Sequence, residues 1–161
     1  MVVTINGTTG ITTPGVSSSD NIVTTGSGSI SSVTTLTSVG DATMGANLIA
    51  DSYQETTVDL TGTSPVVNCA AGNVFTLTTS GNTTFGAATN VPASGTGYGF
   101  MLKLTAGGTH TVDYSLLGTN VYFAGGTAPE PPASGETDIL VFTTMDGGTT
   151  WYGALSIDAA S

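Results

Sequence analysis

The stretch Tyr98-Gly99-Phe100-Met101-Leu102-Lys103-Leu104-Thr105 decides the fold class of this chain. Phe100, Leu102 and Leu104 alternate with other residues, so an extended backbone places them on one face and Lys103 on the opposite face. This period of two is typical of a strand that is buried on one side. We therefore expect a strand here whose Phe100, Leu102 and Leu104 side chains belong to the core.

Similar short runs, separated by Gly, Asn, Asp or Pro, surround this stretch and predict further strands. They are Thr56–Leu60, Val66–Cys69, Val74–Thr79, Thr83–Phe85, Thr109–Leu116, Val121–Phe123, Thr137–Thr144 and Thr150–Ile157. Three Gly-containing segments between runs read as hairpin turns: Ser80–Asn82, Ala106–Gly108 and Asp146–Gly148. Many short strands with frequent turns indicate a β-sandwich, here expected to be jelly-roll-like.

The composition of the 161 residues supports an all-β chain. Hydrophobic residues make up 39% and charged residues only 7%, which differs from the composition of disordered chains. Thr and Val favour pleated surfaces, and the 23 Gly residues supply turns. We assign the predicted β-sandwich to residues 55–161, which contain all the Phe and Trp residues.

Residues 1–54 read as an extended Thr/Ser/Gly-rich assembly arm. Their apolar side chains are scattered singly, and Tyr53 is the first aromatic residue. Such a segment buries too little apolar surface by itself to offset the entropy lost on ordering. Two interpretations stay open: a flexible arm, or a segment that becomes ordered against partner chains. The second predicts an intertwined homotrimer in which three chains share a thin apolar axis.

The net charge of −10 excludes several classes of partner. Lys103 is the single cation beside eleven carboxylates, so the chain lacks the groups that neutralise nucleic-acid phosphates. An anionic membrane surface would repel it. No apolar run approaches the roughly 20 residues that span a bilayer, so we expect no membrane insertion. Acidity of this kind favours solubility for a crowded, exposed protein.

An internal repeat is present in the second part of the chain. Pro92-Ala93-Ser94-Gly95 precedes the strand Tyr98–Thr105, and Pro132-Ala133-Ser134-Gly135 precedes the apolar stretch Asp138–Met145. A Gly-Gly-Thr turn follows each strand, at Gly107 and at Gly147. The repetition predicts two comparable hairpins in two sheets. Chance in a Gly/Thr-rich chain is the alternative.

No recognisable catalytic, cofactor or metal site emerges from the residues. His110 and Cys69 are each the only residue of their type, and we expect a surface strand residue and a small buried hydrophobe respectively. One His and one Cys cannot complete a zinc site in one chain, although three copies of His110 on a threefold axis could bind a metal. The carboxylates are scattered, whereas a glycosidase needs two of them placed on either side of the scissile bond. A carbohydrate-active enzyme is the enzymatic alternative, and an active-site cleft with two facing carboxylates would support it.

The long Pro-rich stretch Gly118–Glu136 contains the candidate contact surface, which consists of the Tyr122/Phe123 pair and the loop Gly125–Ser134. Loops between strands often carry recognition. The residues we single out are Tyr122, Phe123, Pro129, Pro131 and Pro132. The alternative is that they only close one end of the sandwich. Trp151 and Tyr152, after the last turn, are expected to anchor the final strand in the core.

The two ends of the chain resemble those of tailed-phage fibre proteins, especially from marine and cyanobacterial phages. The opening Thr4-Ile5-Asn6-Gly7-Thr8-Thr9-Gly10-Ile11 resembles the start of many such fibres. Three later stretches resemble the C-terminal β-domain of fibres and other virion proteins: Gly95–Phe100, Phe123–Pro129 and Asp146–Gly153. The resemblance implies a trimeric virion protein on the particle surface and transfers no catalytic residue.

This resemblance sets the functional expectation and its alternative. We expect a non-enzymatic, homotrimeric short fibre that contributes to host attachment through a surface glycan. Its arm would bind other virion proteins of the capsid or tail. The chain has no room for the anchoring domain and long stalk usual in tail fibres. A capsid decoration (cement or head-fibre) protein is therefore the alternative.

Overall fold

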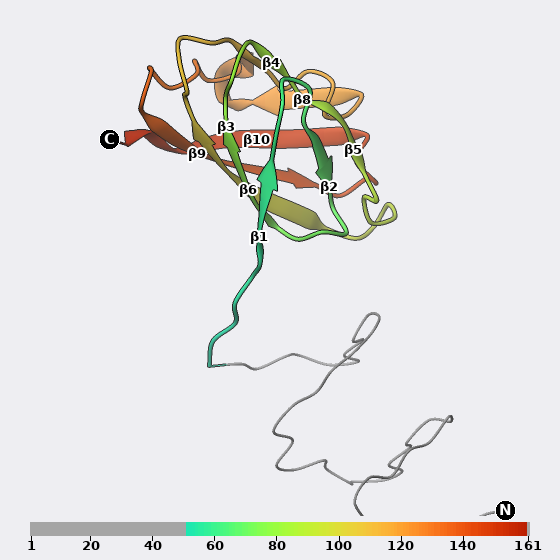
Figure 1. Ribbon diagram of the computed structural model, residues 1–161. Coiled ribbons are helices and arrows are strands. Elements are labelled where there is room, and N and C mark those ends of the chain that lie inside the picture. The colour runs from blue at the N-terminus through green and yellow to red at the C-terminus, as the bar shows by residue number, and fades with distance from the viewer. Residues whose placement is uncertain (1–50, 161) are drawn as a thin grey trace, which may run out of the picture. The chain divides into compact units, whose positions relative to one another are not determined.

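The computed structural model describes residues 51–160 (Figure 1). The predicted arm, residues 1–54, therefore lies almost wholly outside the described residues. Residues 51–56 are exposed and form no strand before the first strand begins at Thr57.

The described residues form ten strands and one short 3-10 turn, which confirms the all-β prediction. In chain order they are β1 (Thr57–Leu60), β2 (Val66–Asn68), β3 (Val74–Thr78), β4 (Thr83–Thr84), β5 (Gly86–Thr89), β6 (Tyr98–Thr105), β7 (Val112–Asp113), β8 (Asn120–Phe123), η1 (Ala124–Gly126), β9 (Thr137–Thr144) and β10 (Thr150–Ala160). β5 was not predicted, because its sequence Gly-Ala-Ala-Thr carries no β-branched or aromatic apolar residue. The strand predicted over Thr109–Leu116 reduces to β7.

The first half of the domain forms three successive coils, β1–β2, β3–β5 and β6–β7, instead of hairpins. Each coil is one loop of chain around the core, and it stacks on the next by parallel strand pairing. β1, β3 and β6 pair in parallel on one side, and β2 pairs in parallel with β5 on another. β4 pairs in parallel with β7. Backbone hydrogen bonds also join neighbouring coils just outside the paired strands. One example is the bond that Phe85 N–H donates to Asp113 O at 2.8 Å. Each coil thus covers the open edge of the previous one.

The second half extends the main sheet with antiparallel strands. β9 pairs antiparallel with β6, β10 pairs antiparallel with β9, and β8 lies parallel to β10 at the far edge. The result is a six-stranded mixed sheet in the order β1-β3-β6-β9-β10-β8, faced by the two-stranded ribbons β2-β5 and β4-β7 (Figure 1). This pairing differs from the expected jelly-roll arrangement, whose strands are antiparallel.

Two of the three predicted hairpin turns are wrong for the same reason. The chain leaves β3 at Ser80–Asn82 and β6 at Ala106–Gly108, but each time it turns into the facing ribbon instead of returning beside the strand it left. Parallel pairing requires this path. The chain must return to the end of the sheet where the first strand began before it can start the next parallel strand. Asp146–Gly148 does form a hairpin turn, between β9 and β10.

The core lies between the six-stranded sheet and the facing ribbons. Phe100, Leu102 and Leu104 of β6 are nearly inaccessible to solvent and Lys103 is exposed, as predicted. The other buried hydrophobic side chains include Val67, Cys69, Phe75, Leu77, Phe85, Tyr114, Leu117, Leu140, Phe142 and Trp151. Trp151 is a core residue as expected, but Tyr152 is 50% exposed, since the alternation of β10 points it outward.

The repeated segments form neighbouring strands of one sheet, not equivalent hairpins of two sheets. Each preceding loop closes in the same way: Thr96 N–H donates to Ala93 O, and Glu136 N–H donates to Ala133 O. Gly95 N–H then donates to Met145 O just beyond β9, while Gly135 N–H donates to Ala106 O just beyond β6. Each loop therefore anchors the far end of the other strand.

Candidate functional site

A hollow of mixed polar and apolar lining at one end of the domain brings together parts of the chain that are distant in sequence. It has a volume of about 340 Å³ and joins the turn after β3, the turn after β6 and the Pro-rich loop before β9. Its walls are Asn82, Thr109, His110, Thr111, Glu130, Pro131, Pro132, Ala133 and Ser134. The hollow therefore contains the only histidine and two of the predicted contact residues.

The imidazole of His110 is held in place from two sides. Its Nδ1 lies 3.0 Å from the hydroxyl of Thr79, a side chain that is only 3% exposed. The ring also lies against Gly108, where a Cβ atom would approach the imidazole Cε1 to 2.9 Å. The absence of a side chain at position 108 is thus what lets the ring occupy this place.

The hydrogen bonds of Thr79 determine which nitrogen of His110 carries the proton in the neutral ring. Thr79 Oγ1 accepts a hydrogen bond from Gly107 N–H at 3.1 Å. Its own proton then needs an acceptor, because a buried hydroxyl without one is destabilised. His110 Nδ1 is the acceptor in reach, so we assign the neutral tautomer that carries its proton on Nε2.

The remaining polar groups of the hollow suit binding better than catalysis. Asn82 Oδ1 accepts from Thr111 N–H at 3.1 Å, which leaves the Asn82 amide nitrogen as a donor. Glu130 supplies a carboxylate acceptor. A triad would need a nucleophile bonded to the imidazole, but among residues 51–160 the hydroxyl bonded to His110 belongs to buried Thr79, not to Ser134.

The structure separates the five predicted contact residues into three places. Tyr122 points outward from β8, with its ring 6.0 Å from that of Tyr152. Phe123 points inward, packs against Tyr114 and Phe142, and borders a small hollow with Pro129. Pro131 and Pro132 line the His110 hollow. The five residues thus form no single surface.

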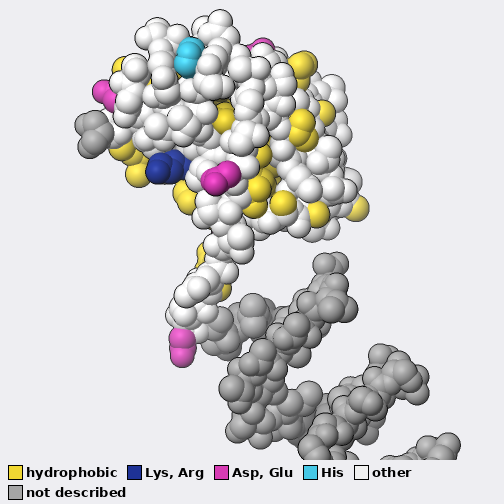
Figure 2. All heavy atoms as spheres, in the orientation of Figure 1, with side chains coloured by type: hydrophobic (Ala, Val, Ile, Leu, Met, Phe, Trp, Pro, Cys, Tyr) yellow, Lys and Arg dark blue, Asp and Glu magenta, His cyan; other side chains and the backbone are white. Residues whose placement is uncertain are grey.

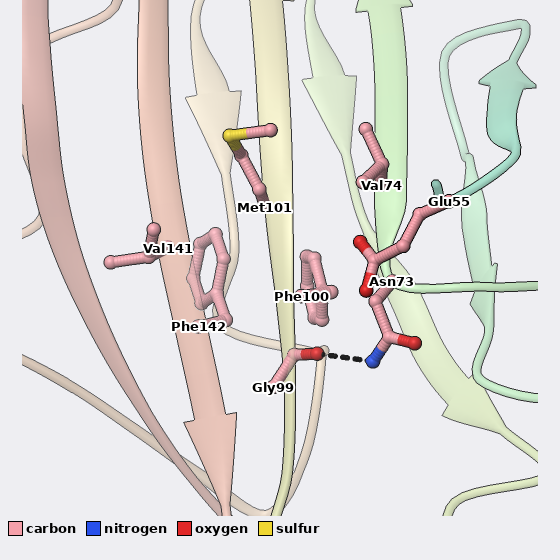
Figure 3. A pocket seen from close by; sticks show the side chains of 8 residues that line it. All are labelled: Glu55, Asn73, Val74, Gly99, Phe100, Met101, Val141 and Phe142. Atoms are coloured by element: carbon pink, nitrogen blue, oxygen red, sulfur yellow. Dashed lines mark hydrogen bonds between the residues drawn. The ribbon is translucent and has the colours of Figure 1, made fainter. Parts of the chain in front are cut away.

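A second hollow, about 360 Å³ in volume, lies near the β1 edge of the six-stranded sheet (Figure 3). Val74, Met101 and Val141 line it from three neighbouring strands, and Glu55 and Asn73 border it on the β1 side. The amide of Asn73 donates to Gly99 O at 2.6 Å, which ties the start of β3 to β6. The lining is therefore mostly apolar, with a single carboxylate.

Cys69 is a buried hydrophobe, as the sequence predicted. The side chain is 8% exposed, and burial raises the pKa of its thiol. Burial likewise raises the pKa of the Tyr98 hydroxyl beside it. Between residues 51 and 160, no three His, Cys, Asp or Glu side chains gather in a way that could hold a metal ion.

Sequence reasoning missed the contribution of Asn82 to the His110 hollow, and it did not connect Glu130 of the predicted contact loop with His110. Asn82 was treated only as a turn residue, and nothing in the local pattern indicates that the turns after β3 and β6 stack on each other. That neighbourhood follows from the parallel pairing of β4 with β7. The outward alternation of Met101 and Val141 was the one available signal for the second hollow.

We found no match of this chain to a protein-family model, to a curated protein or to a solved structure. Over residues 51–160, no helix has the length and apolar character needed to cross a membrane.

Proposed function

We propose that this chain is a non-enzymatic structural protein of a bacteriophage virion, displayed on the particle surface as a homotrimeric short fibre. The proposal rests mainly on where the motifs that resemble tailed-phage fibres lie in the fold. The ring of Tyr98 packs edge-on against Trp151, with 6.3 Å between ring centroids. The ring of Phe123 lies directly against Gly153. The three C-terminal motifs thus meet in one packed region.

These motifs are packing motifs, and this supports a structural role. Trp151 is fully buried, and the Asp146 turn orders the β9–β10 hairpin through Thr144 and Thr150. These contacts stabilise the β-domain, as a structural role requires. The net charge of −10 favours the solubility that a displayed domain needs.

The His110 hollow is our candidate for host contact within this function. It offers Asn82 and His110 as donors, Glu130 as an acceptor, and the apolar walls of Pro131 and Pro132. A neutral surface glycan presents hydroxyl groups and C–H faces that suit such walls. The proposal for attachment therefore centres on this hollow, while Tyr122 and Phe123 serve elsewhere.

The location on the virion can be tested by labelling and counting. Antibodies against the β-domain, applied to purified phage particles in electron microscopy, should label the tail, and quantitative mass spectrometry should give a few trimers per particle. Hundreds of copies spread over the head would instead support the alternative, a capsid decoration protein. Absence from purified particles would overturn both.

A second experiment tests attachment itself. Purified full-length protein should bind host cells and block infection. Replacing Asn82 and Glu130 by Ala should weaken both effects, with Leu116→Ala, an exposed residue outside the hollow, as the matched control. Unchanged binding by the Asn82/Glu130 variant would remove the hollow from the proposal.

A further inference from the structure

One side of the six-stranded sheet, here called the outer face, carries a continuous apolar row. Its members come from four adjacent strands in direct register: Val74 opposite Met101, Met101 opposite Val141, and Val141 opposite Ala154. Beside this row, the outward rings of Tyr122 and Tyr152 lie 6.0 Å apart. The face is therefore covered by apolar and aromatic side chains across most of its strands.

These side chains are accessible, which is unusual for their type on a Thr-rich chain. Met101 is 38%, Val141 40%, Tyr122 52% and Tyr152 50% exposed. Other outward positions of the same sheet, such as Thr76 and Thr143, carry Thr. Grouped exposed apolar side chains of this kind mark interaction surfaces, whereas scattered ones need no explanation.

The charge pattern identifies what covers this face. The outward positions of β6 and β9, the two strands in the middle of this sheet, hold no carboxylate. They do hold Lys103, the only cation of a chain with a net charge of −10. In Figure 2 the single dark blue side chain lies between exposed hydrophobic side chains and an acidic one. The middle of the face is thus free of carboxylates, and towards its β1 edge Asp59 accepts a hydrogen bond from Thr76, the register partner of Lys103.

Copies of an acidic protein repel one another wherever their carboxylates approach. A basic partner would bind best where carboxylates gather, and it would gain nothing from a surface that lacks them. Self-association needs the opposite: an apolar contact without like charges. Glu55 and Asp59 lie towards the β1 edge, so a neighbouring copy can bring carboxylates towards Lys103 while the apolar rows meet.

We infer that copies of this chain associate through the outer face, with Met101, Val141 and Tyr152 at the centre of the contact. The inference rests on the proposed homotrimer and names the surface that forms it. The contact buries the apolar row of each copy and the hollow that Val74, Met101 and Val141 line (Figure 3).

The test uses the full-length chain and measures its molar mass in solution over a range of concentrations. Met101→Glu and Val141→Glu should each raise the concentration at which the trimer dissociates about tenfold or more. Met145→Glu is the matched control, because Met145 is 56% exposed but lies beyond the end of β9. If a Glu variant does not fold, Met101→Thr replaces it in the test. This milder substitution introduces the residue type found at neighbouring outward positions such as Thr76 and Thr143.

The outcomes separate this inference from the proposed function. A wild-type trimer that persists unchanged in the Met101 and Val141 variants overturns the inference and leaves the virion role standing. The same result is expected if residues 1–50 of the same chain cover the face. Dissociation of the variants, in a protein that is absent from virions, supports the inference and overturns the function. A wild-type monomer overturns the outer-face contact together with the trimer.

Discussion

Met101 on β6 and Val141 on β9 lie directly opposite each other, and the two repeated segments of the chain are related about this pair. The two residues are forty positions apart, the same spacing that separates Pro92 from Pro132. An antiparallel pair with this spacing places a local twofold axis through the pair. Each repeated loop consequently meets the end of the opposite strand, as the hydrogen bonds of Gly95 and Gly135 show.

This symmetry predicts that two glycine substitutions have matching effects. Gly95 and Gly135 adopt φ angles of 90° and 89°, which L side chains rarely adopt, and a Cβ atom at either would meet nothing within 4 Å. Gly95→Ala and Gly135→Ala should therefore each lower the free energy of unfolding by about 1–2 kcal/mol from backbone strain alone. Urea denaturation measures both.

Gly97→Ala serves as the control for this pair. Gly97 is also in open space, but its φ lies outside the left-handed region, so its substitution should leave stability unchanged or slightly raised. Clearly unequal costs at Gly95 and Gly135 would contradict the structural equivalence of the two loops.

Gly118 provides a second prediction, because it is close to the only tryptophan. A Cβ atom there would lie 2.4 Å from Gly148 O and 2.6 Å from Trp151 Cδ1, and neither group is free to move. Gly118→Ala should lower the free energy of unfolding by about 3 kcal/mol, towards the upper end of the usual range for overpacking. Denaturant unfolding followed by Trp151 fluorescence tests this, again with Gly97→Ala as the control.

The hydroxyl of Thr79 joins Gly107 to His110, so its removal should cost stability. Thr79→Val keeps the shape of the side chain but leaves Gly107 N–H without its acceptor. The free energy of unfolding should fall by about 1–3 kcal/mol. Thr78→Val, at an exposed neighbouring position, should change it little.

Nuclear magnetic resonance tests the same hydrogen bond independently of stability. In the wild-type protein the nitrogen shifts of neutral His110 should identify Nε2 as the protonated position, because Nδ1 accepts from Thr79. In Thr79→Val this preference should weaken. A proton found on Nδ1 of the wild-type ring would show that Thr79 accepts from His110 instead.

Asp146 should make stability depend on pH in the acid range. The pKa of its carboxyl is lowered, chiefly by the backbone N–H of Thr150 at 2.9 Å and further by the hydroxyl of Thr144. A lowered pKa in the folded state means that the ionised carboxylate stabilises the fold. This contribution is complete above the unfolded pKa of about 3.9 and disappears as the pH falls through the folded value.

Asp146→Asn should therefore be less stable than the wild type at neutral pH, and the two should converge below about pH 4. Thermal unfolding between pH 2 and pH 7 measures the difference. Asp51→Asn, at an exposed position before the first strand, should run parallel to the wild type throughout. A constant gap between Asp146→Asn and the wild type at every pH would show that the charge is not responsible.

Strand positions were largely predictable because alternation is a local property of the sequence. The prediction for Tyr98–Thr105 is confirmed to the residue, and so is that for Thr137–Thr144. The exceptions have local causes. β5 lacks any apolar alternation, and Tyr152 was assigned to the core through its aromatic character, although its neighbour Trp151 already occupied the inward position.

The partners of those strands were not predictable in the same way. A Gly-rich turn such as Ala106–Gly108 can reverse the chain into a hairpin or direct it into the facing ribbon. The same residue types favour both paths, so the turn sequence does not distinguish them. For the same reason, the composition of the candidate site could not be predicted from the sequence. Pro131, Pro132 and His110 were noted separately, and only the stacking of coils brings them to one hollow.

The sequence by itself determined the all-β class, the inward side of β6 and the burial of Cys69 and Trp151, because each depends on side-chain type and a period of two. The tertiary structure alone decided that β1, β3 and β6 pair in parallel, that the repeated segments share one sheet, and that Met101 and Val141 meet on its outer face. These are relations between distant segments. They depend on which backbone edges remain open for pairing after each coil has formed, and no local pattern records that.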